Sequence, residues 1–151
     1  MRIAFDTNIL IYAEGANGEQ PRQAALNVIA RARSETLVVP AQVLGELFNV
    51  LERKAKYSRE AARKAVLDWA DLCVVADTTS EILLTAADLA VKHKLQIWDA
   101  VILSVASQAG CQILLSEDMH DGFTWGGVTV VNPFVEKPNP LLAVLLKPPE
   151  S

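Results

Sequence analysis

The chain has 151 residues and a mass of 16.4 kDa, the length of one domain that buries roughly 70% of its unfolded surface. Hydrophobic residues make up 51% and charged residues 21%, which excludes a disordered chain. With 18 acidic and 14 basic residues the net charge is −4, which argues against a simple basic nucleic-acid binder. The net charge does not exclude a polyanionic substrate. If several acidic residues were gathered around a cation, the remaining acidic and basic residues would be nearly equal in number.

The predicted elements alternate along the chain. Pro21 suits the first turn of a helix, Ser58 suits an N-cap, Thr78 with Glu81 fits a capping box, and Gly110 fits a C-terminal glycine. Strands are expected at residues 2–5, 36–39, 73–76, 112–115 and 128–131. Helices are expected at about residues 7–13, 21–33, 40–56, 59–70, 79–93 and 99–110.

Short apolar strands that alternate with helices indicate βαβ units and a parallel sheet. The predicted fold class is therefore α/β, a three-layer α/β/α sandwich with a five-stranded, mainly parallel sheet. We expect residues 1–132 to form this domain. Residues 133–151 are expected to be a proline-rich, extended C-terminal tail, since five of the seven prolines lie from Asn132 onward.

Neither a signal peptide nor a membrane span is predicted. The N-terminus lacks the apolar core, about 7–15 residues long, of a signal peptide. The late apolar run Leu141–Leu146 is far shorter than the ~18 residues of a membrane span. We therefore expect a soluble, cytoplasmic protein. Cys73 and Cys111 are expected to be buried, reduced thiols.

Acidic residues follow the predicted strands, where ligands bind in open parallel sheets. Asp6 follows the first strand, and Asp118 follows the fourth. Glu46 lies on the helix after the second strand, and Asp99 begins the helix that leads into the fourth. Because the fold brings all four toward one crevice, we expect them to form a site.

Each acid alone also has a simpler interpretation. Asp6 suits a turn or cap, and Asp99 suits an N-cap. Asp118 lies in a loop with Asp121, where a turn is the default. Glu46 shares a helix face with polar neighbours, as a solvated face would. Their common position is what favours a site.

The helix after Asp99 is apolar nearly all round, so it is expected to be buried. A charge at the start of a buried helix needs a partner or a metal. Four carboxylates within ~4–6 Å would repel by about 1–4 kcal/mol per pair. Oxygen ligands without His or Cys select Mg²⁺ or Mn²⁺. The sequence therefore predicts a Mg²⁺ (or Mn²⁺) site.

Four blocks in order resemble the PIN-domain nucleases, and among them the VapC-type toxins of toxin–antitoxin pairs. The resemblance extends over residues 1 to about 132. The blocks are Ile3-Ala4-Phe5-Asp6-Thr7-Asn8-Ile9-Leu10, Glu46-Leu47-Phe48-Asn49-Val50-Leu51, Asp99-Ala100-Val101-Ile102 and Leu114-Leu115-Ser116-Glu117-Asp118. The resemblance implies the strand order 3-2-1-4-5.

By this resemblance Asp6, Glu46, Asp99 and Asp118 correspond to the family's acidic, metal-binding catalytic residues. Asn8 and Ser116 correspond to supporting polar residues. The fourth block reads Ser-Glu-Asp, a departure that leaves Asp121 competing with Asp118 for the outer position. The proline-rich tail is a second departure from the family core.

The resemblance implies a metal-dependent endoribonuclease, the toxin of a type II toxin–antitoxin system, that hydrolyses RNA phosphodiester bonds with a metal-activated water. The alternatives are a non-catalytic acidic partner-binding domain and a haloacid-dehalogenase-like phosphatase, which would need an acid where Asn8 stands. The expected partners are the RNA substrate, a cognate antitoxin and a second copy of the chain in a homodimer, for which the apolar run Leu141–Leu146 is the motive.

Six of the fourteen basic residues lie between positions 53 and 64. Arg53, Lys54, Lys56 and Arg59 are the candidates to hold RNA phosphates, although a solvated helix end would look the same. Trp69, Trp98 and Trp125 are expected in the core or in a lid rather than as base-stacking platforms.

Overall fold

The computed structural model describes residues 1–137 and 139–145. Its elements follow the predicted alternation closely. They are β1 (Arg2–Phe5), α1 (Thr7–Ala13), α2 (Glu19–Ala32), β2 (Thr36–Pro40), α3 (Ala41–Arg53), α4 (Arg59–Leu72), β3 (Val74–Ala76), α5 (Ser80–His93), α6 (Ile97–Gln108), β4 (Ile113–Leu115), β5 (Thr124–Trp125), β6 (Val128–Val131) and α7 (Pro140–Leu145).

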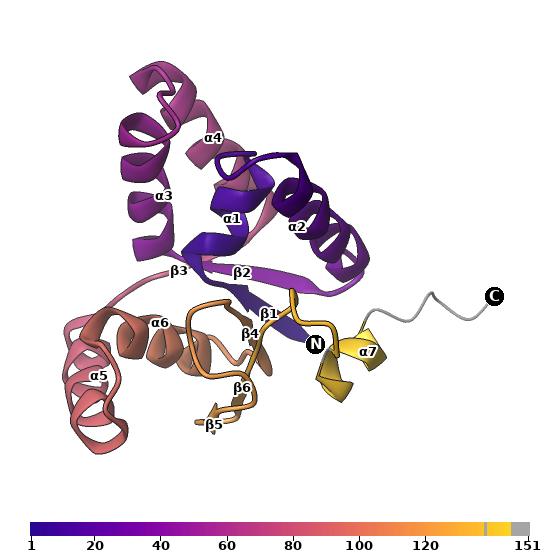
Figure 1. The fold of residues 1–151 in the computed structure, drawn as a ribbon. Coiled ribbons are helices and arrows are strands. Elements are labelled where there is room, and N and C mark those ends of the chain that lie inside the picture. Colours follow the sequence, from indigo (N-terminus) through magenta and orange to yellow (C-terminus); the bar gives the residue numbers. More distant parts are fainter. Residues whose placement is uncertain (138, 146–151) are drawn as a thin grey trace.

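The sheet has the order β3-β2-β1-β4-β6-β5, and every pair is parallel except β5 with β6. Helices α1 to α4 lie on one side of the sheet and α5 and α6 on the other (Figure 1). The predicted three-layer α/β fold and the predicted order of its five strands are confirmed. The central strand β4 is apolar throughout, and β1 is apolar and buried after Arg2, since both of their faces are covered.

The sixth strand, β5, was not predicted. It pairs with β6 through a two-residue turn at Gly126 and Gly127, both of which have positive φ. A Cβ at position 126 would press on the side chain of Ser107, and the φ of +58° also favours glycine there. The Gly-Gly pair was the available signal, but a two-residue strand is too short to show alternation.

Two predicted helix starts are wrong. Helix α5 is capped by Thr79, whose Oγ1 accepts a 3.2 Å hydrogen bond from the amide of Ile82, rather than by Thr78 in a box with Glu81. Helix α6 begins at Ile97 with Gln96 as its N-cap, so Asp99 lies inside its first turn. The simpler interpretation of Asp99 as an N-cap is thereby excluded.

The predicted extended tail contains a helix. The side chain of Asn139 accepts a hydrogen bond from the amide of Leu141, and Leu142 is buried in the core at 1% exposure. The apolar run that motivated the homodimer therefore packs at least partly on its own chain. Leu146 and residues 147–151 lie outside the described residues. The division at residue 132 stays a prediction.

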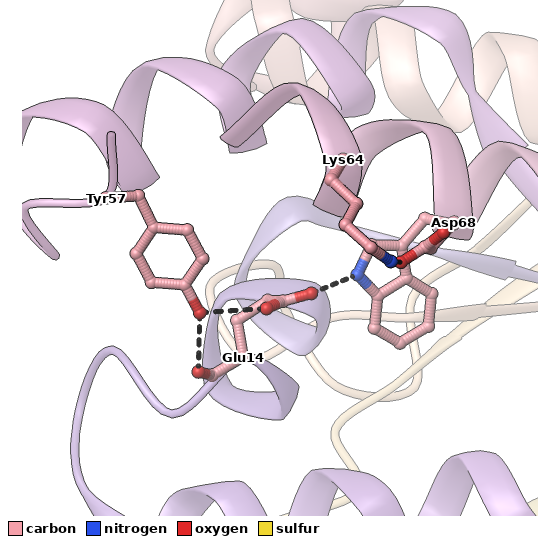
Figure 2. A network of polar contacts seen from close by, with 5 residues as sticks. Glu14, Tyr57, Lys64 and Asp68 are labelled. Carbon is pink, nitrogen blue, oxygen red and sulfur yellow. Dashed lines mark hydrogen bonds and ion pairs between the residues drawn. The ribbon is translucent and has the colours of Figure 1, made fainter. Parts of the chain in front are cut away.

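A carboxylate links three helical segments on the α1–α4 side. Figure 2 shows Tyr57 beside Glu14, and its hydroxyl lies 2.9 Å from Glu14 Oε2 and 3.2 Å from the Glu14 carbonyl oxygen. The indole N–H of Trp69 donates to Glu14 Oε1 over 2.8 Å. Glu14 thus ties the end of α1 to the α3–α4 turn and to α4.

Cys73 and Cys111 are both free and buried, as predicted, and burial raises the pKa of each thiol to about 11. None of the helices in the described ranges has the length and apolar character of a membrane span.

Candidate functional site

The order in which the chain adds strands to the sheet reverses between β1 and β4. From β1 the chain adds β2 and β3 on one side, and it then returns to add β4 on the other side of β1. Ligands of open α/β sheets bind outside the carboxyl ends of the strands at such a point. Asp6 follows β1 there, and Ser116, Glu117 and Asp118 follow β4. The amide of Asp6 donates to the carbonyl of Leu115 over 2.9 Å, which joins the two strand ends.

A cavity of about 250 Å³ opens at this edge. It is lined by all four of the predicted acids, Asp6, Glu46, Asp99 and Asp118. They come from four separate parts of the sequence, and the fold brings them together as expected. The other lining residues are Thr7, Asn8, Ile11, Asn49, Val50, Trp98 and Ile102.

Asp6 is the most deeply placed of the four, with 5% of its surface exposed. Its side chain caps α1 by accepting a 2.7 Å hydrogen bond from the amide of Thr7. Ser116, fully buried, donates to the other carboxylate oxygen over 2.7 Å. Both bonds favour the ionised form, but burial outweighs them and, with the charges of Asp99 and Asp118, raises the pKa of Asp6 to about 6.

Glu46 is held by two neighbours. Helix α3 begins directly after β2, which places Glu46 over the carboxyl ends of the strands. Thr7 Oγ1 donates to its Oε2 over 2.5 Å, and Gln42 Nε2 donates to its Oε1 over 2.9 Å. Gln42 lies one helical turn before Glu46 on the same face. These bonds orient the carboxylate of Glu46.

Asp99 sits in the first turn of α6, where the helix dipole favours a negative charge. Burial raises its pKa nonetheless, and the charges of Asp118 and Glu46 raise it further. The pKa values of Asp6 and Asp99 are both raised, so without a cation the site favours neutral forms of these two side chains. A bound cation reverses that preference.

The two candidate acids of the fourth block occupy different positions in the structure. Asp118 lines the cavity and accepts a hydrogen bond from the side-chain amide of Asn8. Asp121, the expected competitor, does not line it, and its carboxylate accepts the amide of Asn132 over 3.0 Å. Glu117 accepts a 3.0 Å bond from the Tyr12 hydroxyl. Asp121 therefore contacts the backbone at Asn132 and is not among the residues that line the cavity.

The two expected supporting residues each contact one of the four acids. Ser116 contacts Asp6, and Asn8 contacts Asp118. Thr7 and Gln42, which hold Glu46, were missed. Spacing gave a signal for Gln42, since it precedes Glu46 by four positions on one helix. No spacing rule predicts the contact of Thr7 with Glu46, which lies 39 positions away.

The expected phosphate-binding residues lie outside the cavity lining. Arg53 is one turn beyond Asn49 and Val50, which do line it, whereas Lys54 and Lys56 lie in the following turn. Arg59 pairs with Glu52 over 2.7 Å and stacks on Phe48, so its charge is already partly balanced.

Oxygen donors of this kind fit a divalent cation. In the described residues no group of three or more His, Cys, Asp or Glu side chains is arranged to hold a metal ion as it stands, although the four carboxylates line one cavity. An open site suits Mg²⁺, which keeps several waters and binds through one or two carboxylates together with substrate phosphates.

Among known protein families, the one described as PIN domain matches residues 3–120 of this chain, a range that includes all four acids of the cavity. A comparison with curated protein sequences finds no significant match. Solved structures share the fold at low identity.

One of them is VapC20 of Mycobacterium tuberculosis, a sarcin-ricin loop cleaving toxin. It is 22% identical with a TM-score of 0.64, and the match covers 77% of this chain and 89% of that one. A toxin–antitoxin complex from Klebsiella pneumoniae is 20% identical with a TM-score of 0.65, over 87% of this chain and 98% of that one. VapBC2 from Rickettsia felis, bound to a DNA fragment from its promoter, is 18% identical with a TM-score of 0.60, over 78% and 89%.

Proposed function

The chain belongs to the PIN domain family, and from this premise we propose that it is a metal-dependent endoribonuclease and the toxin of a type II toxin–antitoxin pair. The observation that carries the nuclease proposal is the meeting of Asp6, Glu46, Asp99 and Asp118 in one cavity at the switch point of the sheet.

In this proposal the four carboxylates hold Mg²⁺ or Mn²⁺. When bound, the cation supplies an activated water at neutral pH and stabilises the negative charge that develops on the phosphate. Ser116 and the amide of Thr7 fix the orientation of Asp6, Thr7 and Gln42 fix that of Glu46, and Asn8 holds Asp118. Such bonds keep ligand oxygens within the narrow geometry that phosphoryl chemistry requires.

The RNA backbone needs positive charge outside the acidic cavity. Three exposed basic residues lie beyond the residues that line the cavity, Arg53 at the end of α3 and Lys54 and Lys56 in the turn after it. We assign them to phosphate contacts that position the RNA without reading its sequence. Arg59 joins them more weakly, because Glu52 already pairs with it.

A cognate antitoxin is proposed as the protein partner. The support is the likeness to VapBC2 and to the toxin–antitoxin complex from Klebsiella pneumoniae, which contain both components. The homodimer is proposed on a different surface from the one first expected, since Leu142 is buried in its own chain. Leu84 and Val91, one face of α5, are 71% and 83% exposed. Light scattering at micromolar concentration tests it, and a monomeric mass contradicts it.

The nuclease proposal is tested by substitution of the acids. Asp6→Asn, Glu46→Gln and Asp99→Asn each keep the side-chain volume and remove the charge. Each is expected to abolish Mg²⁺- or Mn²⁺-dependent cleavage of generic RNA while circular dichroism shows a folded chain. A near-wild-type rate in any of the three contradicts the role of that residue. Turnover of a small phosphoester without RNA cleavage would favour a phosphatase instead.

A further inference from the structure

Trp98 is the exposed aromatic residue of the cavity wall. It precedes Asp99 in the first turn of α6, lines the same cavity and is 55% exposed. Of the two positions expected for the tryptophans, the core or a lid, this exposure excludes the core for Trp98. Trp69 does pack in the core and has a hydrogen-bond partner for its indole N–H, and Trp125 is half-buried.

The cavity offers both kinds of contact that a nucleotide needs. Its carboxylates supply the cation-binding side, and Ile11, Val50 and Ile102 supply apolar surface beside the indole of Trp98. At about 250 Å³ it is smaller than the ~300–1,000 Å³ typical of pockets for drug-sized ligands. A base that is paired and stacked within an A-form duplex cannot lie flat against this indole.

We propose that Trp98 is a stacking platform for an unpaired nucleobase next to the phosphate that is cut. This proposal rests on the proposed nuclease function and adds to it a residue that positions the base beside the cut. Unstacked bases are commonly held on aromatic side chains in this way, with little preference for one base. Trp98 is a positioning residue, whereas the acids carry the chemistry.

The first test compares cleavage of a single-stranded RNA oligonucleotide with cleavage of the same sequence in a duplex, in Mg²⁺. Trp98→Ala is expected to raise KM for the single strand about tenfold, because an aromatic partner for the base is lost. Trp98→Phe keeps an aromatic ring and is expected to leave KM for the single strand closer to the wild-type value than Trp98→Ala does. Ile97→Ala is the matched control, since Ile97 is 40% exposed on the same turn but does not line the cavity. It is expected to leave KM unchanged.

The second test needs no cleavage. In the Glu46→Gln variant with Mg²⁺, single-stranded RNA is expected to quench tryptophan fluorescence, whereas the duplex does not. The quenching disappears when Trp98→Phe is added, which leaves Trp69 and Trp125 as the remaining fluorophores. Because this readout is binding, it separates failure of the stacking proposal from failure of the nuclease proposal.

Three results would overturn the stacking proposal. The first is a wild-type KM for Trp98→Ala, and the second is equal cleavage of duplex and single strand. The third is a lower mass of Trp98→Ala in light scattering, which would assign the exposed indole to contact with a second copy of the chain. A wild-type chain that cleaves no RNA overturns the nuclease proposal, while the fluorescence still decides whether Trp98 contacts bases.

Discussion

Ser116 donates a 2.7 Å hydrogen bond to Asp6 across 110 positions of the sequence. The bond joins the carboxyl ends of β1 and β4, the adjacent central strands between which the sheet changes direction. It therefore fixes the deepest acid of the cavity to the sheet itself rather than to a loop. The orientation of Asp6 depends on the same register that builds the core.

The raised pKa of Asp6 makes stability depend on pH. Asp6 has a pKa of about 6 in the fold, compared with 3.8 for an unperturbed Asp, so between about pH 4 and pH 6 the folded chain holds a proton that the unfolded chain has released. The free energy of unfolding consequently falls as pH rises through that window. The shift corresponds to at most about 3 kcal/mol.

We expect this fall in denaturant titrations of the wild type in EDTA between pH 4 and pH 7. Asp6→Asn has no proton to lose and is expected to show a shallower fall. Asp121→Asn, outside the cavity lining, serves as the control and keeps the wild-type slope. Parallel pH profiles for wild type and Asp6→Asn would show that burial of Asp6 does not set its pKa.

Substitution of the two candidate acids of the fourth block, Asp118 and Asp121, is expected to affect RNA cleavage differently. Asp118→Asn is expected to reduce metal-dependent RNA cleavage by at least about 10–100-fold, the usual effect of disturbing a metal site. Asp121→Asn keeps an oxygen to accept the amide of Asn132, so its rate is expected within about twofold of wild type. Single-turnover rates at saturating Mg²⁺ measure both. A larger loss for Asp121→Asn than for Asp118→Asn would reverse the assignment.

The positions of the acids could be predicted because they depend on regular elements. The carboxyl ends of parallel strands meet at one edge, so Asp6, Asp118 and the helices with Glu46 and Asp99 converge whatever the loops do. The choice between Asp118 and Asp121 was not predictable. Both lie in one loop, and they differ in the donor that each one meets, which is the side-chain amide of Asn8 for Asp118 and the backbone amide of Asn132 for Asp121.

Short elements were not predicted from the sequence, also for a physical reason. Helix α7 spans six residues, too few for periodicity, although Asn139 followed by Pro140 is a typical helix start. The exposure of Trp98 was also missed, because an apolar residue beside a buried helix suggests burial. Only the three-dimensional position of the first turn of α6 shows that its indole faces the cavity rather than the core.

The network around Glu14 is expected to stabilise the α1–α4 side of the sheet. Glu14→Ala removes the carboxylate that accepts from Tyr57 and Trp69. The Tyr57 hydroxyl keeps the backbone carbonyl of residue 14 as an acceptor, whereas the indole N–H of Trp69 loses its partner, and an unsatisfied polar group costs about 1–3 kcal/mol. The expected fall in the thermal midpoint is several degrees. Glu14→Gln keeps one acceptor oxygen, so its thermal midpoint is expected to lie between those of the wild type and Glu14→Ala.

Lys64→Ala is the control for this network. Lys64 pairs with Asp68 over 2.9 Å on the surface of α4, near Glu14 in Figure 2, but both side chains are largely exposed. Such pairs contribute little, so the midpoint is expected to stay at the wild-type value. Differential scanning calorimetry measures all three variants. An unchanged midpoint for Glu14→Ala would show that water replaces the lost acceptor.

The last prediction concerns the charge of Asp99 when no cation is present. Its carboxylate gains from the dipole of α6, a favourable effect of typically 0.3–1 kcal/mol. Burial and the charges of Asp118 and Glu46 oppose that gain, because each of them raises the pKa of Asp99. Without metal, the fold is therefore more compatible with a neutral side chain at this position than with an aspartate.

Asp99→Asn is thus expected to be inactive and yet more thermostable than wild type in EDTA, by a few degrees for about 1 kcal/mol. Added Mn²⁺ is expected to raise the midpoint of wild type more than that of the variant, because a single site at one hundred times its Kd stabilises by about 2.7 kcal/mol. A capping role would predict no change, since Asn caps as well as Asp, but the N-cap of α6 is Gln96. Thermal scans of both chains in EDTA and in Mn²⁺ decide the matter. Equal midpoints in EDTA together with equal responses to Mn²⁺ would contradict a cation site shared by the four acids.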